Sequence, residues 1–511
     1  LLERSAIANL SVRTAKGGTT AGDGYLTIGA GTRAGAPSDE AGLALASEEH
    51  FEAGTAGEAY GRRLGSPLRG VAGMLSLPAY RERNDSLLYK ARIGALGDAL
   101  DDAGMGRAVI ANADTAQSPG SPFVFGRQAA AALMDRNGAL AAGRVDRGLL
   151  RFEPRAAFGL ALDTPKVLSA FQAVWRDRSV VLVEASDLAR ADAYRQLVGE
   201  SSGQWLFEDA LRSTDELVAA LLSRVDLTRH AVLTIAPVSP TGPSRLTVAG
   251  LAAPGQLPGL LRSSSTRRPG FVALIDVAPT VLDLLGVAED RSMDGRPLGL
   301  DRPGDSYEQR VAALVSSERN ARFRDDLLFP VAWAFVILQL VLSGTAILVL
   351  RRPGRWRLVL EVASLTLLAV LPCTYLAALA PFADWGAAAY AVFLGLGAIS
   401  LGCAAWRLGG RRGRSAETTR RSLLPLEVVL ATMAGVLLVS AVSGSPLQLS
   451  TVFGDSPIVG GRFTGINNMS FAQLAVAAFL LAGFLLHRLG PGRGTAAAMA
   501  LLMVVLVVDG A

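Results

Sequence analysis

Residues 271–298 read FVALIDVAPTVLDLLGVAEDRSMDGRPL, and this stretch decides how the first part of the chain is interpreted. The run from Phe271 to Ile275 is almost wholly apolar, as expected of a strand that is buried on both faces. Asp276 follows in the position of a helix N-cap, and apolar residues up to Leu285 supply one face of a helix that Gly286 ends. The stretch therefore predicts one strand-to-helix unit of an α/β domain.

Segments with strand and helix patterns alternate along residues 1–326. The expected strands are Tyr25–Ile28, Ala108–Ala111, Ser179–Val183, Ala231–Ile235 and Phe271–Ile275, and the expected helices include Leu87–Ala103, Pro165–Trp175 and Thr214–Ser223. Because strands alternate with helices, we expect a mostly parallel sheet between helices. Gly- and Ser-rich segments follow several of these strands, where α/β proteins place their binding sites.

Residues 327–511 have the composition of a membrane domain. Apolar segments of the roughly 20 residues that a spanning helix needs occur at 327–350, 358–380, 385–406, 424–444 and 469–487, and a sixth begins near Ala496. The sequence thus predicts an α/β soluble domain at 1–326 followed by an all-α polytopic transmembrane domain. Because the chain starts at Leu1 and the sixth segment runs to Ala511, we interpret both domains as cut at the chain ends.

Charge sets the expected orientation. Arginines cluster in the first, third and fifth connections between the expected spans, so the positive-inside rule makes these connections cytoplasmic and residues 1–326 extracytoplasmic. The net charge of +5 arises in the membrane domain, which has 13 Arg and no Lys against 6 acidic residues. No nucleic-acid surface is therefore predicted. Cys373 and Cys403 lie in expected spans and predict neither a disulfide framework nor a cysteine metal site.

The ending IDVAPTVLDLLG, followed by MDGRPL, resembles the C-terminal signature of the alkaline-phosphatase-like superfamily, which includes sulfatases and nucleotide phosphodiesterases. Other segments resemble the family in the same order: TTAGDGYLTIGAGTRA from Thr19, VLVEASDLARADAY from Val181 and LTVAGLAAPG from Leu246. The resemblance implies two metal ions, bound by Asp and His, which activate a Thr, Ser or Cys nucleophile toward phosphate or sulfate esters.

Residue by residue, the resemblance implies Thr19 or Thr20 as nucleophile and Asp23, Asp187 and Asp192 as ligands of a divalent metal (Mg, Ca or Zn) if the domain is active. Where the family has Asp-His-Gly, however, the chain has Ala236-Pro237-Val238, which offers no ligand side chain. Only His50 and His230 lie in the domain. We therefore expect a degenerate, non-catalytic domain without a cofactor, and the alternative is an active metal-dependent phospho- or sulfo-hydrolase or transferase.

Two further segments suggest anion binding. Arg267 and Arg268 follow a run of serines and could hold an anionic head group or a sugar phosphate, or could be a solvated loop. The long loop between the fourth and fifth expected spans carries Arg462, Asn467 and Asn468, which suit a phosphate-bearing lipid. This loop resembles one in polytopic envelope proteins that carry phosphatase-like domains, and simple packing of the loop remains an equal alternative.

A competing motif is GAGTRA at Gly29–Ala34, which matches the GxGxxA turn of dinucleotide-binding proteins if Tyr25–Ile28 is a strand. We favour instead a multi-pass protein of the bacterial plasma membrane that contacts membrane lipids and binds an anionic envelope glycan or lipid. A third alternative is a transporter of a lipid-linked precursor, with the soluble domain as gate. Few ionisable residues lie in the expected spans, which argues against an ion-coupled carrier.

Overall fold

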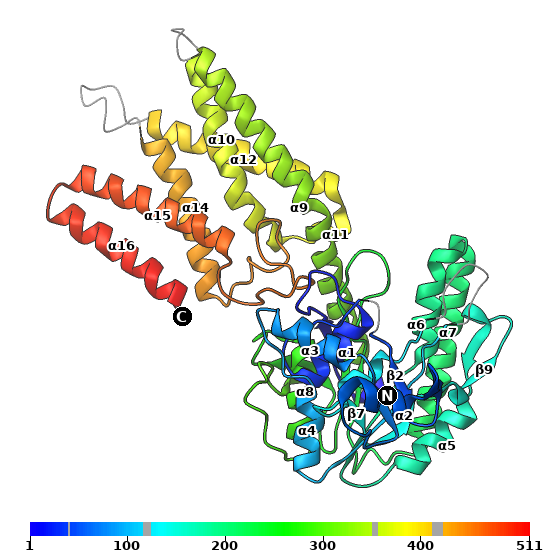
Figure 1. Cartoon of the computed structure of the whole chain (residues 1–511). Coiled ribbons are helices and arrows are strands. Elements are labelled where there is room, and N and C mark those ends of the chain that lie inside the picture. Colours follow the sequence, from blue (N-terminus) through cyan, green and yellow to red (C-terminus); the bar gives the residue numbers. More distant parts are fainter. Residues whose placement is uncertain (39–40, 116–123, 350–355, 411–422, 511) are drawn as a thin grey trace. The chain divides into compact units, whose positions relative to one another are not determined.

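The computed structural model of the protein describes residues 1–38, 41–115, 124–349, 356–410 and 423–510. The chain divides into two compact units, Leu1–Leu314 (unit 1) and Val315–Ala511 (unit 2). In Figure 1, unit 1 contains the sheets and shorter helices in blue to green, and unit 2 contains the long helices in yellow-green to red. An α/β part is therefore followed by an all-α part, as the sequence predicts.

The largest sheet of unit 1 is built around β1 (Ala6–Ser11), a fully buried strand. Its other strands are β12 (Val232–Ile235), β13 (Thr247–Ala252), β14 (Gly259–Ser263), β15 (Phe271–Ala273) and β16 (Leu298–Pro303). β1 is parallel to β14 and β15 but antiparallel to β13, and the β12–β13 and β14–β16 pairs are also antiparallel. The sheet is mixed, so the expectation of a mostly parallel sheet is wrong here.

A second sheet, in the order β11 (Ser179–Val183), β6 (Gly106–Ile110) and β8 (Ala142–Arg144), is parallel throughout. Its apolar side chains pack with α5 (Thr164–Val174) and α7 (Glu200–Leu222) through Val167, Phe171 and Leu217. α6 (Ser186–Tyr194) follows β11. The strands predicted at Ala108–Ala111 and Ser179–Val183 and the helix predicted at Pro165–Trp175 are confirmed within a residue or two.

The remaining elements of unit 1 are short. They are α2 (Ala56–Leu64), α3 (Leu77–Asp85), α4 (Ala95–Asp102), the sheet of β2 (Ala44–Ala46), β5 (Ala72–Met74) and β7 (Ala139–Leu140), and the hairpins β3 (His50–Phe51) with β4 (Gly54–Thr55) and β9 (Leu150–Phe152) with β10 (Leu160–Leu162). The helix predicted at Leu87–Ala103 is confirmed only in its second half, as α4.

Residues 25–28 belong to a helix, α1 (Ala21–Ala30), and the predicted strand at Tyr25–Ile28 is wrong. Thr20 and Asp23 form a capping box that starts this helix. Leu26 of α1 and Leu10 of β1 are fully buried in the main core of unit 1. A dinucleotide-binding turn needs a strand before its first glycine, and a helix lies there, so the GxGxxA interpretation is wrong as well.

The stretch around Asp276 folds as β15, a 3-10 turn η6 (Leu274–Asp276) and helix α8 (Val277–Leu284). The helix is therefore confirmed and the strand is confirmed over Phe271–Ala273, whereas Leu274 and Ile275 lie in the 3-10 turn and Asp276 does not cap α8 through its side chain. Its fully buried carboxylate accepts hydrogen bonds from the backbone N–H of Ala273 (2.9 Å), the backbone N–H of Arg296 (3.0 Å) and the hydroxyl of Ser265 (2.5 Å). Asp276 thus ties two neighbouring loops to the end of β15.

Unit 2 is a bundle of long apolar helices. They are α9 (Tyr307–Val349, which begins in unit 1), α10 (Trp356–Leu376), α12 (Ala387–Gly410), α14 (Leu424–Val442), α15 (Asn468–Leu489) and α16 (Arg493–Gly510), with the short α11 (Phe382–Trp385). Five helices among the described residues are long and apolar enough to cross a membrane, and Arg493–Val507 is a shorter apolar helix. This is the pattern of a multi-pass membrane protein, while the arginine-rich connections at 350–355 and 411–422 lie outside the described residues.

The loop between α14 and α15, residues 443–467, packs into the helix bundle. Leu447, Val452, Phe453 and Ile466 are buried in the same apolar cluster as residues of α10, α14 and α15. Arg324 of α9 holds the loop by donating from Nε to the carbonyl of Thr451 (3.1 Å) and from Nη2 to that of Gly454. The loop is therefore a folded part of unit 2 rather than a free connection.

Candidate functional site

The predicted nucleophiles lie in residues 12–20, which connect β1 to α1. The Thr19 hydroxyl donates to the carbonyl of Val12 (2.6 Å). The Thr20 hydroxyl donates to Oδ2 of Asp23 (2.8 Å) and accepts from the backbone N–H of Asp23 (3.2 Å). Asp23 is fully buried, and its Oδ1 accepts from the backbone N–H of Ala36 (2.7 Å). All three side chains thus hold the loop and the first turn of α1 in place.

The other two predicted metal ligands lie on α6, and each is engaged in local structure. Oδ1 of Asp187 accepts from the backbone N–H of Leu162 (3.0 Å) and pairs with the buried Arg190. Oδ2 of Asp192 accepts from the backbone N–H (2.8 Å) and hydroxyl (2.7 Å) of Thr241. Among the described residues, no three or more His, Cys, Asp or Glu side chains are grouped so that they could share a metal ion.

The turn that replaces the family's Asp-His-Gly lies directly against α1. A Cβ atom on Gly24 would come within 2.4 Å of the carbonyl oxygen of Pro237, so only a glycine fits at this contact. Two segments of the resemblance therefore meet in space, the start of α1 and the turn after β12. The side chains of Ala236, Pro237 and Val238 contribute no metal-ligating atom at that meeting point.

The predicted anion-binding residues divide into exposed and structural positions. Arg267 is exposed, has φ 53° and donates its backbone N–H to the carbonyl of Ser263 (2.8 Å), and Arg268 is half-buried. Arg462 donates to the carbonyl of Ile466 within the 443–467 loop. Asn467 caps α15 by accepting from the backbone N–H of Ser470 (2.7 Å), and exposed Asn468 begins the same helix. Asn467 is therefore occupied by the helix it starts.

Sequence reasoning missed a basic cluster made of Arg13, Lys16, Arg33 and Tyr89, which we call the Arg13 cluster. Nη1 of Arg33 donates to the phenol oxygen of Tyr89 (2.9 Å), and the guanidinium carbon lies 5.5 Å from the centre of that ring. Arg13 bonds the same phenol, and burial together with repulsion from Arg33 lowers the pKa of Arg13. Lys16 donates to the carbonyl of Ala36 (3.2 Å). Two guanidiniums therefore converge on one neutral oxygen.

One sequence signal could have found part of this cluster. Residues 11–20 read SVRTAKGGTT, which places two cations and two glycines between a strand and a helix. Such a loop is a common place for anion recognition, because backbone N–H groups and the helix N-terminus face the ligand. Without knowing that residues 6–11 form the central strand, however, the position of the loop at the end of a sheet could not be inferred.

A second polar cluster lies beyond the carboxyl ends of β6 and β11. Fully buried Arg127 pairs with buried Asp114 (2.8 Å) and with Glu49, and these pairs raise its pKa although burial alone would lower it. Burial raises the pKa of Glu184, against the opposing effect of hydrogen bonds from Ser186 (2.5 Å) and the phenol of Tyr25. Because these side chains pair and hydrogen-bond with one another, the cluster connects the parallel sheet to α1.

Comparison of the chain with protein-family models, with curated proteins and with solved structures gives no match. The resemblance to the alkaline-phosphatase-like superfamily therefore depends on the sequence motifs alone.

Proposed function

We propose that this chain is a multi-pass protein of the bacterial plasma membrane whose extracytoplasmic unit 1 is a degenerate alkaline-phosphatase-like domain. In this proposal unit 1 binds an anionic glycan or lipid without hydrolysing it. The arginine-rich connections along the sequence support the orientation, and the five apolar helices of spanning length support the multi-pass character.

The capping box of α1 is the observation that carries the non-catalytic part of the proposal. The Asp23 carboxylate accepts from the backbone N–H of Thr20 (3.1 Å), the Thr20 hydroxyl (2.8 Å) and the backbone N–H of Ala36 (2.7 Å). A metal ion at Asp23, or deprotonation of Thr20, would compete with the hydrogen bonds that start the helix. Thr20 and Asp23, which match the family's nucleophile and metal-ligand positions, thus hold the start of α1 in place, which supports a role in binding.

The Arg13 cluster supports an anionic ligand. It gathers three cations in one loop region of a unit whose own net charge is slightly negative by sequence. Nζ of Lys16 lies 3.8 Å from Oδ1 of Asp23, which is already bonded to Ala36. Cations attract anions, and guanidiniums suit phosphate and sulfate groups in particular.

The test uses the full-length protein in phosphatidylcholine nanodiscs. We expect isothermal titration to detect binding of a soluble phosphorylated sugar, glucose 1-phosphate, and no turnover of bis-p-nitrophenyl phosphate with Mg²⁺, Ca²⁺ or Zn²⁺. Metal-dependent turnover that disappears in T19A, T20A or D187N would overturn the non-catalytic assignment. A protein that binds no phosphorylated, sulfated or carboxylated sugar and no anionic lipid would overturn the binding role.

A further inference from the structure

The apolar part of α9 stands largely free of the helix bundle. Phe323 and Leu327 pack against the apolar cluster of unit 2, and the ring of Phe335 lies 6.4 Å from that of Phe453. Beyond this point most residues at positions 336–348 are exposed. Among the five spanning helices of the described chain, α9 is the one whose most apolar 18 residues include none that is buried, whereas the other four bury 22–44% of theirs.

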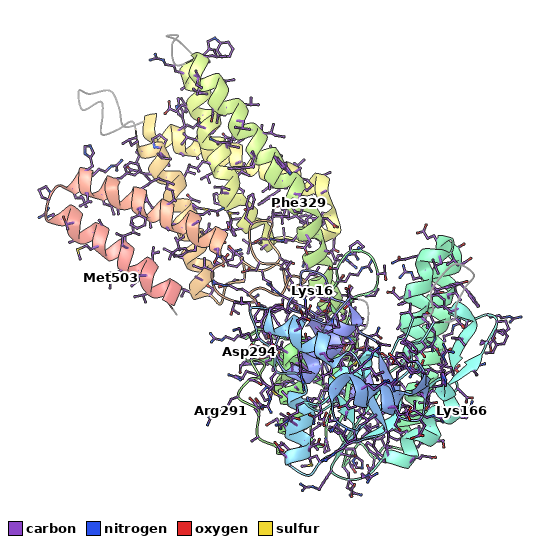
Figure 2. All side chains as sticks on the ribbon, viewed as in Figure 1. Lys16, Lys166, Arg291, Asp294, Phe329 and Met503 are labelled. Atoms are coloured by element: carbon purple, nitrogen blue, oxygen red, sulfur yellow. The ribbon has the colours of Figure 1, made fainter. Side chains whose placement is uncertain are left out.

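Exposure of apolar side chains does not by itself indicate a protein partner. Phe329 of α9 and Met503 of α16, both labelled in Figure 2, are 69% and 56% exposed, and lipid tails cover such side chains in a membrane. A polar side chain at the same depth is different, because hydrocarbon offers it no hydrogen bond. Thr345 meets this need within its own helix, since its hydroxyl donates to the carbonyl of Leu342 (2.9 Å).

Gln339 is a carboxamide in the middle of this exposed stretch. The 20 residues from Pro330 to Val349 include no charged residue, and Gln339 is the tenth of them. Its Nε2 donates to the hydroxyl of Ser343 at 3.5 Å, the long limit of a hydrogen bond, and its side chain has no other hydrogen-bond partner in the part of the chain that the structure describes. In contrast, Gln473 of α15 accepts a hydrogen bond from the phenol of Tyr375 (2.9 Å). The bundle thus satisfies one glutamine through a neighbouring helix and leaves the other without such a partner.

Small residues lie beside Gln339 on the same side of α9. Residues three, four and seven positions apart share one face of a helix, which places Val336, Ser343 and Ala346 next to Gln339. We call these four residues the Gln339 face. Small side chains let two membrane helices approach closely, and polar side chains between such helices exchange hydrogen bonds. The Gln339 face therefore has the composition of a surface that packs against another helix.

We propose that the Gln339 face binds the same face of a second copy of this chain, which makes the protein a homodimer in the membrane. A carboxamide has both a donor and an acceptor, so two copies satisfy each other through a reciprocal pair of Nε2–H to Oε1 hydrogen bonds. Both copies insert with the same topology, and a two-fold axis along the membrane normal therefore brings the two Gln339 side chains to the same depth. An unrelated helix would meet this condition only if it carried a matching polar residue there. The dimer is independent of the ligand proposed for unit 1.

The first test measures dimerisation of the full-length protein by sedimentation equilibrium in a density-matched detergent, over a range of protein-to-detergent ratios. We expect the wild type to be a reversible dimer. Q339L removes both hydrogen bonds between the copies and should weaken the dimer about tenfold, whereas Q339N retains a donor and an acceptor and should recover part of that loss. A346I places a bulky side chain on the Gln339 face and should weaken the dimer at least as much as Q339L.

The controls alter the other side of the same helix. Ala334 and Thr345 lie five and six positions from Gln339, which turns them away from its face. A334I adds the same bulk as A346I, and T345V removes a hydroxyl that is satisfied within α9, so both variants should dimerise as the wild type does. Far-UV circular dichroism at high detergent, where all the proteins are monomeric, should be the same for every variant and separates loss of the dimer from loss of the fold.

Cross-linking tests the same contact in a lipid bilayer. In vesicles, Q339C should form a disulfide between two copies when copper phenanthroline is added, because equivalent residues on a two-fold axis come close enough to be bridged. V341C lies on the opposite side of α9 and should not cross-link. The wild type gives the background, since Cys373 and Cys403 lie on α10 and α12.

Three results would overturn the proposed dimer. The first is a wild type that stays monomeric at every detergent ratio, together with no cross-link in Q339C. The second is a dimer that Q339L and A346I leave as strong as the wild type, since its interface would then lie elsewhere. The third is a Q339C protein that, in native membranes, cross-links to a different membrane protein and not to a second copy, because the Gln339 face would then belong to that partner.

Discussion

Replacing Asp276 by alanine is expected to destabilise unit 1 by about 3 kcal/mol. The substitution leaves the backbone N–H groups of Ala273 and Arg296 without their acceptor (2.9 and 3.0 Å), and an unsatisfied buried donor costs about 1–3 kcal/mol. The hydroxyl of Ser265 is exposed enough to find water instead. Part of the loss is offset because burial disfavours the charged carboxylate and raises the pKa of Asp276.

Urea unfolding of the full-length protein in detergent, read by pulse proteolysis of unit 1, measures this change. D276S separates the two possible roles of the residue, because serine is a good helix N-cap but is too short to reach both N–H groups. We therefore expect D276S to be nearly as unstable as D276A, and D276N to lie between D276A and the wild type. D283A removes an exposed carboxylate from the same helix and should change stability by no more than about 0.5 kcal/mol. A D276S protein as stable as the wild type would show that the residue acts only as a cap.

Three further perturbations give sharp expectations. Burial raises the pKa of Glu184. The contribution of Glu184 to stability is therefore full below its unfolded pKa of about 4.3 and is lost as pH rises through its folded pKa. Thermal unfolding across pH should show the wild type losing stability relative to E184Q as pH rises above about 4.3. R324Q removes two hydrogen bonds to the 443–467 loop, and hydrogen exchange there should accelerate at least about tenfold, whereas R322Q, which breaks only a 3.8 Å pair on the same helix, should not change it. N467A removes the cap of α15 and a 3.1 Å bond to the carbonyl of Phe453, and should cost about 1–2 kcal/mol in the unfolding of unit 2; equal midpoints for N467A and the wild type would contradict the capping role.

The sequence predicts the fold best where one kind of pattern extends over many residues. The apolar segments of unit 2 could hardly be anything but helices, because only a helix satisfies its own backbone over such a length in a membrane. The strand Ser179–Val183 was predicted at its observed bounds, since a run of β-branched residues between polar ends has one good interpretation. Long or compositionally extreme segments thus leave little room for tertiary contacts to change the outcome.

Short mixed segments were less predictable. Tyr25–Ile28 contains three residue types that favour strands, yet the capping box of Thr20 and Asp23 starts a helix four residues earlier. That T-x-x-D signal was present in the sequence. In contrast, residues 6–11, AIANLS, have no pattern that marks a central strand, and they become one because β13, β14 and β15 bring partners from residues beyond 246.

The same limit applies to the site. Thr19, Thr20 and Asp23 are neighbours in the sequence, but the contacts of Thr19 and Asp23 depend on Val12 and Ala36, which the folded chain brings close. The Arg13 cluster depends on Tyr89, more than 50 residues from Arg33. One sequence indicates which residues can do chemistry, whereas the assembly of a site from distant segments requires the fold.

Arg324 has a consequence for how unit 2 is synthesised. Its acceptors on Thr451 and Gly454 are 127 and 130 residues further along the chain. At about 5–20 residues per second, the ribosome needs roughly 6–26 s to deliver them after Arg324 itself has been added. During that interval the guanidinium of Arg324, which precedes the apolar part of α9, has Asp325 beside it but lacks both loop carbonyls. Folding of the 443–467 loop is thus the step that gives Arg324 these two acceptors, and a nascent chain arrested before residue 451 should expose Arg324 to chemical labelling that the finished protein resists.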